Sequence, residues 1–154
     1  METILTSLTQ VRELYDFDYN MNTSQFEQMM ARVQRNSLKS LLGDDLYEDI
    51  TADTPSMSYT NLLPYIYNYC SAAFAAKFVI EGNVFHTNRG NYQFQQDTTT
   101  AAQGWQIKQL SENYKSEQNT YANELIEYLN DNATTYTLWQ SDKTESLGFS
   151  FGIV

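Results

Sequence analysis

The sequence contains few of the residues that cross-link a chain or interrupt its helices and strands. Its 154 residues include one cysteine, two prolines and six glycines. The single cysteine, Cys70, excludes an intramolecular disulfide, and we interpret it as a small apolar residue of a helix. So few prolines and glycines, beside 14% aromatic residues, argue against a disordered chain. We therefore expect one domain with its own hydrophobic core.

Basic residues are also scarce and scattered. Nine lysines and arginines stand against nineteen acidic residues, which gives a formal net charge of −10. Proteins that hold nucleic-acid phosphates gather Lys and Arg in patches, so the composition argues against DNA or RNA binding. An acidic surface favours solubility. It would also suit a passage through which DNA slides without sticking, because like charges repel.

Long hydrophobic runs are absent. No apolar run approaches the roughly 20 residues that a membrane-spanning helix needs. The most apolar stretch, residues 65–80, is interrupted by Asn68 and Lys77. The first residues lack the basic and long apolar regions of a signal peptide. We therefore predict neither a signal peptide nor a membrane segment.

Residues for catalysis or metal binding are few. His86 is the only histidine, and with Cys70 it supplies at most two ligands, fewer than a zinc site needs. No Gly-x-Ser-x-Gly element or glycine-rich phosphate loop is present. One acidic cluster could perform acid–base chemistry or could simply favour the start of a helix through the helix dipole: Asp44, Asp45, Glu48 and Asp49. We favour the second interpretation and predict no enzyme activity, no cofactor and no metal site.

Apolar residues recur at helical spacing in the first third of the chain. A short helix is expected after a cap at Thr6 or Ser7, and a second helix after a cap within residues 22–24. The apolar face of the second helix comprises Phe26, Met29, Met30, Val33, Ser37 and Leu41. Gly43 is placed to end this helix in a left-handed conformation, and Asp44 is placed to cap a short third helix.

Two longer helical stretches follow. Thr60 is a candidate cap for the first of them, Pro64 falls in its opening turn, and residues 81–83 end it. Its apolar stripe is wide and contains many alanines, so we expect it to be buried against more than one neighbour. From about Ala101 to Leu129 the pattern is helical again, with a narrow seam formed by Ile107, Leu110, Tyr114, Tyr121, Leu125 and Tyr128.

Alternating residues predict two extended segments. Residues 84–96 flank the turn sequence Asn88-Arg89-Gly90-Asn91 and predict a β-hairpin. The end of the sequence, residues 147–154, predicts an extended arm. This arm could dock on its own core, on a neighbouring copy or on the sheet edge of another protein. The predicted protein-interface residues are the apolar ones of both segments: Phe85, Tyr92, Phe94, Phe149, Phe151, Ile153 and Val154.

These patterns together predict a mainly α fold. We expect a bundle of four to five helices, with a small β-hairpin at about residues 84–96 inserted between two long helices. A single helical domain should cover residues 1–146, and the extended C-terminal arm should cover residues 147–154.

The element Leu41-Leu42-Gly43-Asp44-Asp45-Leu46-Tyr47-Glu48 resembles one found in the small head–tail connector proteins of tailed bacteriophages. Those proteins typically carry a Leu-Gly-x-x-Leu-Tyr element after their second helix. The resemblance continues in order through Leu62-Leu63-Pro64-Tyr65-Ile66, the hairpin, Leu125-Ile126-Glu127-Tyr128-Leu129 and Leu138-Trp139. It spans about residues 8–140 and is nearest to connectors of Bacteroidetes phages, including the crAss-like group.

The resemblance implies a structural protein of the virion, made in the host cytoplasm. Such connectors form rings, commonly of about twelve copies, beneath the portal protein. They extend the DNA channel without binding DNA specifically, dock tail or neck proteins, and use no enzyme activity, cofactor or membrane. Two alternatives stay open from the residues. One is a helical adaptor or chaperone-like module for a single protein partner, and the other is an enzyme that uses the acidic cluster near Asp44.

Overall fold

A computed structural model describes residues 2–15, 21–81, 84–87, 90–93 and 104–140. Within these ranges the protein is mainly α-helical, as predicted. The helices are α1 (Leu8–Leu14), α2 (Thr23–Val33), the π-helix η1 (Gln34–Leu38), α3 (Lys39–Leu42), α4 (Asp44–Ile50), α5 (Leu63–Glu81) and α6 (Gly104–Asp131). Because α2, η1 and α3 follow one another without a break, the described residues form five separate helical stretches.

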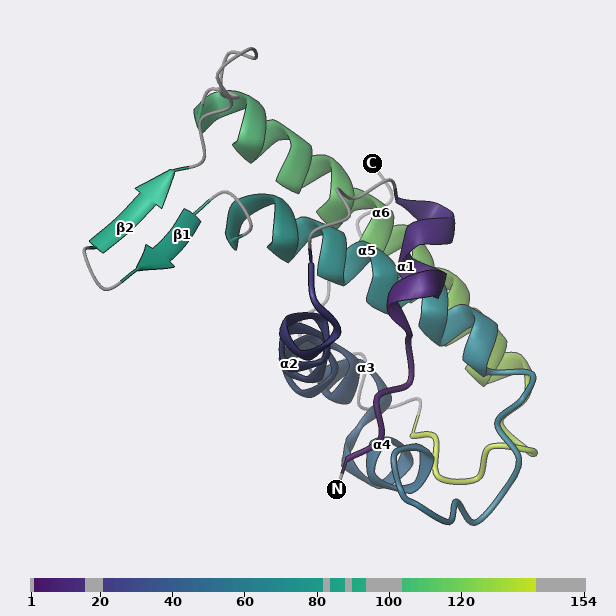
Figure 1. Cartoon of the computed structure of the whole chain (residues 1–154). Helices are drawn as coiled ribbons and strands as arrows, with labels where there is room; N and C mark the ends of the chain where they lie inside the picture. Colours follow the sequence, from purple (N-terminus) through teal and green to yellow (C-terminus); the bar gives the residue numbers. More distant parts are fainter. Residues whose placement is uncertain (1, 16–20, 82–83, 88–89, 94–103, 141–154) are drawn as a thin grey trace.

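The two longest helices, α5 and α6, lie side by side (Figure 1). Helices α1, α2 and η1 contact α5, and α4 packs against α3. Two short strands, β1 (Val84–Thr87) and β2 (Gly90–Gln93), pair antiparallel with Phe85 opposite Tyr92. They fall within residues 84–96, for which the sequence predicts a hairpin. Residues 88–89 and 94–96 lie outside the described part of the chain.

The starts of the first helices follow from side-chain caps. Ser7 accepts the backbone N–H of Gln10, whose side chain accepts the N–H of Ser7, so the two residues form a capping box at α1. Asn22 caps α2 by accepting the N–H of Gln25. Both caps lie among the predicted positions.

The cap predicted for α4 is wrong. Asp44 lies inside the first turn, and Gly43 is the N-cap. Gly43 has a φ of +81°, which a residue with a Cβ rarely adopts, so it ends α3 as predicted. Its carbonyl accepts the N–H of Tyr47 at 3.1 Å. One glycine therefore closes one helix and opens the next, and this moves the start of α4 back by one residue.

Helix α5 forms the centre of the core, as its wide apolar stripe predicts. Its buried residues lie on all sides of the helix and include Cys70: Ile66, Tyr69, Cys70, Ser71, Ala72, Ala73, Phe74, Ala75 and Ala76. Phe26 of α2 packs against Phe74, with 5.0 Å between the ring centroids. The alanines let neighbouring helices approach closely, and this explains why α6 can run along most of α5.

Two contacts fix how α6 runs along α5. Ser111 donates to the carbonyl of Ala76 at 3.0 Å, and Gln118 donates to the hydroxyl of Tyr69 at 3.2 Å. Ala76 lies seven residues after Tyr69, and Ser111 lies seven residues before Gln118. The helices therefore run antiparallel, with the same spacing between the two contacts on each helix. This register brings the end of α5 beside the start of α6.

The seam predicted for α6 is confirmed in part. Leu125 is buried as predicted, and three predicted tyrosines pack beside the core: Tyr114, Tyr121 and Tyr128. Leu110 is 40% exposed, whereas its neighbour Ser111 is buried. Ser111 takes the place of Leu110 because its small side chain lets the two helices approach closely.

A similar displacement occurs where α2 continues into η1. Ser37 was predicted to lie on the buried face, but it is only partly buried, while Gln34 and Leu38 are buried. A π-helical turn holds more residues than an α-helical turn, so it moves the buried stripe around the helix.

Residues after α6 return to the core beside α4. The ring of Tyr136 stacks on Tyr59 at 6.0 Å, and Trp139 donates from Nε1 to Asn130 at 2.8 Å. One continuous core thus extends from Val11 to Trp139. The predicted boundary at residues 146–147 lies outside the described residues.

Candidate functional site

The structure describes only part of the predicted interface. Phe85 and Tyr92 occupy paired backbone positions on β1 and β2. The other predicted interface residues lie outside the described residues: Phe94, Phe149, Phe151, Ile153 and Val154. Among the described residues, the large apolar side chains that are exposed lie on helices: Leu14, Ile80, Trp105 and Leu110.

The first half of α6 carries two of these side chains. Among residues 104–121 of this helix only Ser111 is buried. Trp105 is 63% exposed and Leu110 is 40% exposed. Ile80, in the last turn of α5, is 48% exposed. Because Ile80 lies one turn beyond Ala76 and Trp105 lies before Ser111, both residues lie at the strand-bearing end of the helix pair (Figure 1).

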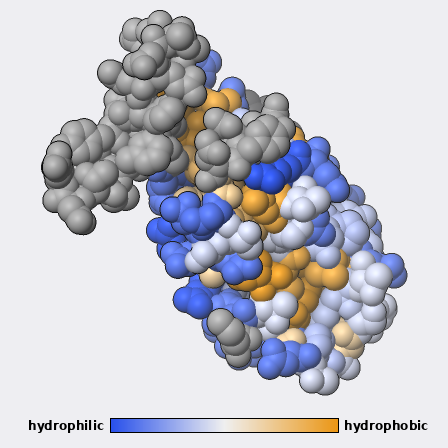
Figure 2. All heavy atoms as spheres, in the orientation of Figure 1, coloured by the Kyte–Doolittle hydropathy of each residue, from blue (hydrophilic) through white to orange (hydrophobic). Residues whose placement is uncertain are grey.

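We call Ile80, Trp105 and Leu110 the apolar end. Sequence reasoning missed Trp105 because it lies outside the helical seam. The sequence did contain a signal for Trp105. Residues of the seam pack against the core, so a large apolar residue outside the seam is a candidate for contact with another molecule. Figure 2 shows apolar residues gathered in a band between polar margins on the face that it views.

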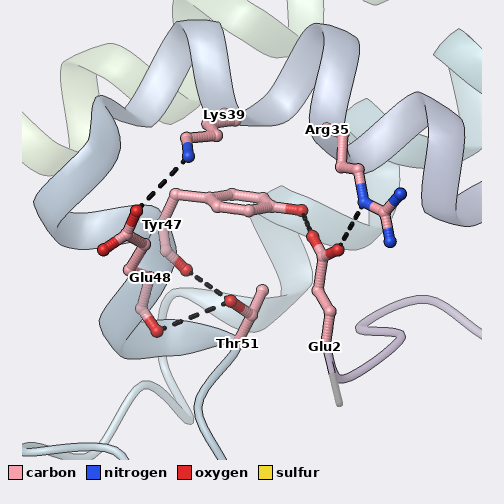
Figure 3. Close-up of a pocket in the computed structure, with 6 residues that line it drawn as sticks. All are labelled: Glu2, Arg35, Lys39, Tyr47, Glu48 and Thr51. Carbon is pink, nitrogen blue, oxygen red and sulfur yellow. Dashed lines mark hydrogen bonds and ion pairs between the residues drawn. The ribbon is translucent and has the colours of Figure 1, made fainter.

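A second feature is a small hollow of about 300 Å³ between η1, α3 and α4. Six residues line it (Figure 3): Glu2, Arg35, Lys39, Tyr47, Glu48 and Thr51. The carboxylate of Glu2 accepts hydrogen bonds from the Tyr47 hydroxyl and from Nε of Arg35, the latter at 2.6 Å. Glu2 thereby bonds to residues on two sides of the hollow, Arg35 of η1 and Tyr47 of α4.

The other charges of the hollow also form pairs. Nζ of Lys39 lies 3.4 Å from a carboxylate oxygen of Glu48 and 3.7 Å from one of Asp44. The same ammonium group lies 5.8 Å from the centre of the Tyr47 ring, at the distance of a cation–π contact. Acidic and basic groups thus neutralise one another here. The arrangement suits the docking of a chain segment better than the binding of a charged substrate.

The acidic cluster on α4 makes structural contacts. Asp44 and Asp45 lie in the first turn, where the helix dipole favours negative charge, as we interpreted them from the sequence. Asp49 accepts the N–H of Ser56 at 3.0 Å and the hydroxyl of Tyr59. The hydrogen bond from Tyr59 lowers the pKa of Asp49 below its ordinary value. This carboxylate therefore organises the loop between α4 and α5.

Cys70 is fully buried, and burial raises the pKa of its thiol to about 12. A buried thiol of that pKa is a poor nucleophile. Across the described ranges, no group of three or more His, Cys, Asp or Glu side chains could hold a metal ion. None of the described helices combines the length and apolar character needed to cross a bilayer.

Comparisons with curated proteins and with solved structures find no match to this chain. A family profile, described as a family of unknown function, matches residues 38–146. The matched region begins at the end of η1 and includes α3, α4, α5 and α6, hence most of the core and the apolar end. With this coverage of its length, the chain belongs to the DUF6712 family of unknown function.

Proposed function

We propose that this protein is a structural subunit of a bacteriophage neck, where copies assemble into a ring between the portal protein and the tail. The family resemblance noted in the sequence suggests this role. The single observation that supports assembly is the apolar end, where Trp105 is 63% exposed and Ile80 is 48% exposed. A tryptophan exposed to this degree is a typical anchor of a protein–protein contact.

Burying the apolar end in an interface would stabilise an assembly. Fully burying a large apolar side chain is worth about 1.5–3 kcal/mol, and aromatic anchors commonly dominate an interface. Trp105 and Ile80 come from two different helices that are held in step by the Ser111–Ala76 hydrogen bond. The two side chains are therefore presented from a rigid base, which lowers the entropy lost on association.

In this proposal residues 84–96 form a small hairpin inserted between α5 and α6, within a bundle of four to five helices. Phe85, Tyr92 and Phe94 of the hairpin, together with the arm over residues 147–154, contact neighbouring copies or other neck proteins. The protein forms a ring of about twelve copies in the virion. The net charge of −10 supports a channel that DNA traverses without specific binding.

The proposal is tested with the purified full chain by light scattering and negative-stain electron microscopy. We expect closed rings for the natural sequence and monomers for Trp105→Glu, because a buried carboxylate opposes association. Asn123→Glu is the matched control, since it adds the same charge at an exposed position further along α6. Circular dichroism should show the same helix content in both variants.

One result would contradict the ring, and another would contradict the role of the apolar end in it. One is a natural protein that stays monomeric at high concentration and binds one partner outside the virion, as expected of an adaptor or chaperone-like module. The other is ring formation that Trp105→Glu leaves unchanged, which would remove the apolar end from the interface.

A further inference from the structure

Helix α6 has an open side that runs from Trp105 to Asn130. Trp105 lies 25 residues before Asn130, which is about seven turns at 3.6 residues per turn, so both residues lie on the same side of the helix. The residues between them on this side are exposed and polar: Glu112, Ser116, Asn119 and Asn123. The open side is therefore a polar track that ends, at the strand-bearing end of the molecule, in one exposed tryptophan (Figure 1).

The described part of the chain ends at the opposite end of this side. Nε1 of Trp139 donates to Asn130 at 2.8 Å, and the side chain of Gln140 donates to Asp45 at 3.3 Å. Gln140 is the last described residue, and residues 141–154 follow it. These residues therefore begin close to Asn130, at the far end of the open side from Trp105.

The reach of residues 141–154 matches the length of the open side. Phe151 follows Gln140 by eleven residues, which span about 36 Å in an extended chain at about 3.3 Å per residue. Trp105 lies about 37 Å from Asn130 along α6, at a rise of about 1.5 Å per residue. An extended segment therefore brings Phe151 to Trp105. A helix of the same fourteen residues would span only about 21 Å and would not reach it.

The order of polar and apolar residues matches as well. Residues 141–146 are all polar, and an extended course from Asn130 places them beside the polar residues of the open side. The apolar residues come later, in the arm over residues 147–154, at the distance where Trp105 lies. In an extended arm Phe149, Phe151 and Ile153 point to the same side because successive side chains alternate. One face of the arm can therefore cover Trp105.

We propose that residues 141–154 of the unassembled subunit lie along the open side of their own α6, with Phe151 against Trp105. The inference goes beyond the proposed ring, because it concerns the protein before any partner binds. The occupant is the chain's own segment, since that segment starts at one end of the open side and has the length to reach the other. An exposed apolar group invites non-specific contacts. The arm shields Trp105 from them until a partner displaces it.

The test measures how well acrylamide quenches the fluorescence of Trp105 in dilute, monomeric, full-length protein. The other tryptophan, Trp139, is 7% exposed, and a Trp105→Phe variant gives its signal for subtraction. We expect the paired substitutions Phe149→Ser and Phe151→Ser to increase quenching and to shift the emission of Trp105 to longer wavelength. Ser150→Asn, on the opposite side of an extended arm, is the matched control and should change neither. Equal quenching in the natural protein and the paired variant would overturn the proposal.

A mixing experiment distinguishes the chain's own arm from that of a second copy. The Trp105→Phe chain has a natural arm, and the chain with the paired substitutions has a natural Trp105. We expect Trp105 to stay open to acrylamide when the two are mixed, because each arm acts within its own chain. Protection in the mixture would assign the arm to a neighbouring copy and overturn the proposal. Circular dichroism checks the fold, and Phe151→Ser alone replaces the paired variant if helix content is lost.

Discussion

Tyr15 donates a hydrogen bond from its hydroxyl to the carboxylate of Glu117, and this contact joins α1 to α6 across 102 positions of sequence. Burial of the ring, the hydrogen bond and the negative charge of Glu117 all raise the pKa of Tyr15 above its ordinary value. Burial is also the chief cause of raised pKa values at four other tyrosines: Tyr59, Tyr69, Tyr114 and Tyr136. The protein therefore holds a set of tyrosines that resist ionisation while it is folded.

The first prediction concerns alkaline pH. A pKa that is higher in the folded state than in the unfolded state contributes stability below the unfolded value of about 10. That stability is lost as the pH rises through the raised values. We expect tyrosinate absorbance to rise together with the loss of helical circular dichroism above pH 10. Tyr15→Phe should make the loss less steep. Ionisation of these tyrosines in a still-folded protein would contradict the prediction.

The second prediction concerns Gln34. Gln34→Ala removes the partners of the Leu5 N–H and the Thr3 carbonyl. Leaving a buried polar group unsatisfied costs about 1–3 kcal/mol, and less where the backbone near Thr3 and Leu5 moves so that water can reach it. We expect the free energy of unfolding in urea to fall by about 1–3 kcal/mol, with faster hydrogen exchange at Thr3 and Leu5.

The control for this prediction is Gln28→Ala on the exposed face of α2. A surface substitution of this kind changes stability by about 0.5 kcal/mol or less. Equal effects of the two substitutions would show that the hydrogen bonds of Gln34 to Thr3 and Leu5 do not stabilise the fold.

The third prediction compares two glycines. Gly43 has a φ of +81° and Gly104 does not have a positive φ, yet a Cβ would meet no atom within 4 Å at either position. Lack of space for a Cβ therefore does not distinguish the two positions, whereas the positive φ at Gly43 does. Gly43→Ala should destabilise the protein by about 1–3 kcal/mol. Gly104→Ala should stabilise it by about 0.4–1 kcal/mol, because it restricts the unfolded chain. Thermal unfolding measures both, and the same sign for both variants would contradict the argument.

The fourth prediction concerns the spacing of α5 and α6. Ser111 is buried against the backbone of Ala76, so Ser111→Leu forces the helices apart and should cost about 1–3 kcal/mol. Ser116→Leu, at an exposed position one to two turns later, is the matched control. We expect urea unfolding to leave the control near the natural protein. Similar free energies of unfolding for both variants would show that a larger side chain fits between α5 and α6 at position 111.

Much of the helical fold could be predicted because each helix repeats its apolar residues often. The wide stripe around Cys70 identified the central helix, and Gly43 marked a helix end by its lack of a Cβ. The predicted burial was wrong at individual residues where the packing between helices determines which side chain is buried. Leu110 was placed in the seam because it is apolar, yet Ser111 is buried because its small side chain lets the helices touch.

The candidate site was less predictable from the sequence. Residues 3–5 are held by Gln34, a polar residue whose burial follows from a π-helical turn that apolar spacing does not reveal. Thr3 and Thr51 lie far apart in the sequence and meet through backbone groups, which carry no residue-type signal. Trp105 lies outside the seam, so the helical spacing of apolar residues does not identify it.

The π-helical turn also makes this stretch tolerant of a change in length. A turn of this kind arises where a helix accommodates one residue more than its regular winding allows. Losing one residue between Gln34 and Leu38 would restore an ordinary α-helix and leave the flanking helices facing the same way. The same loss within α5 would rotate everything after it by about 100°. Length variation among related sequences should thus gather at this turn and spare the central helix.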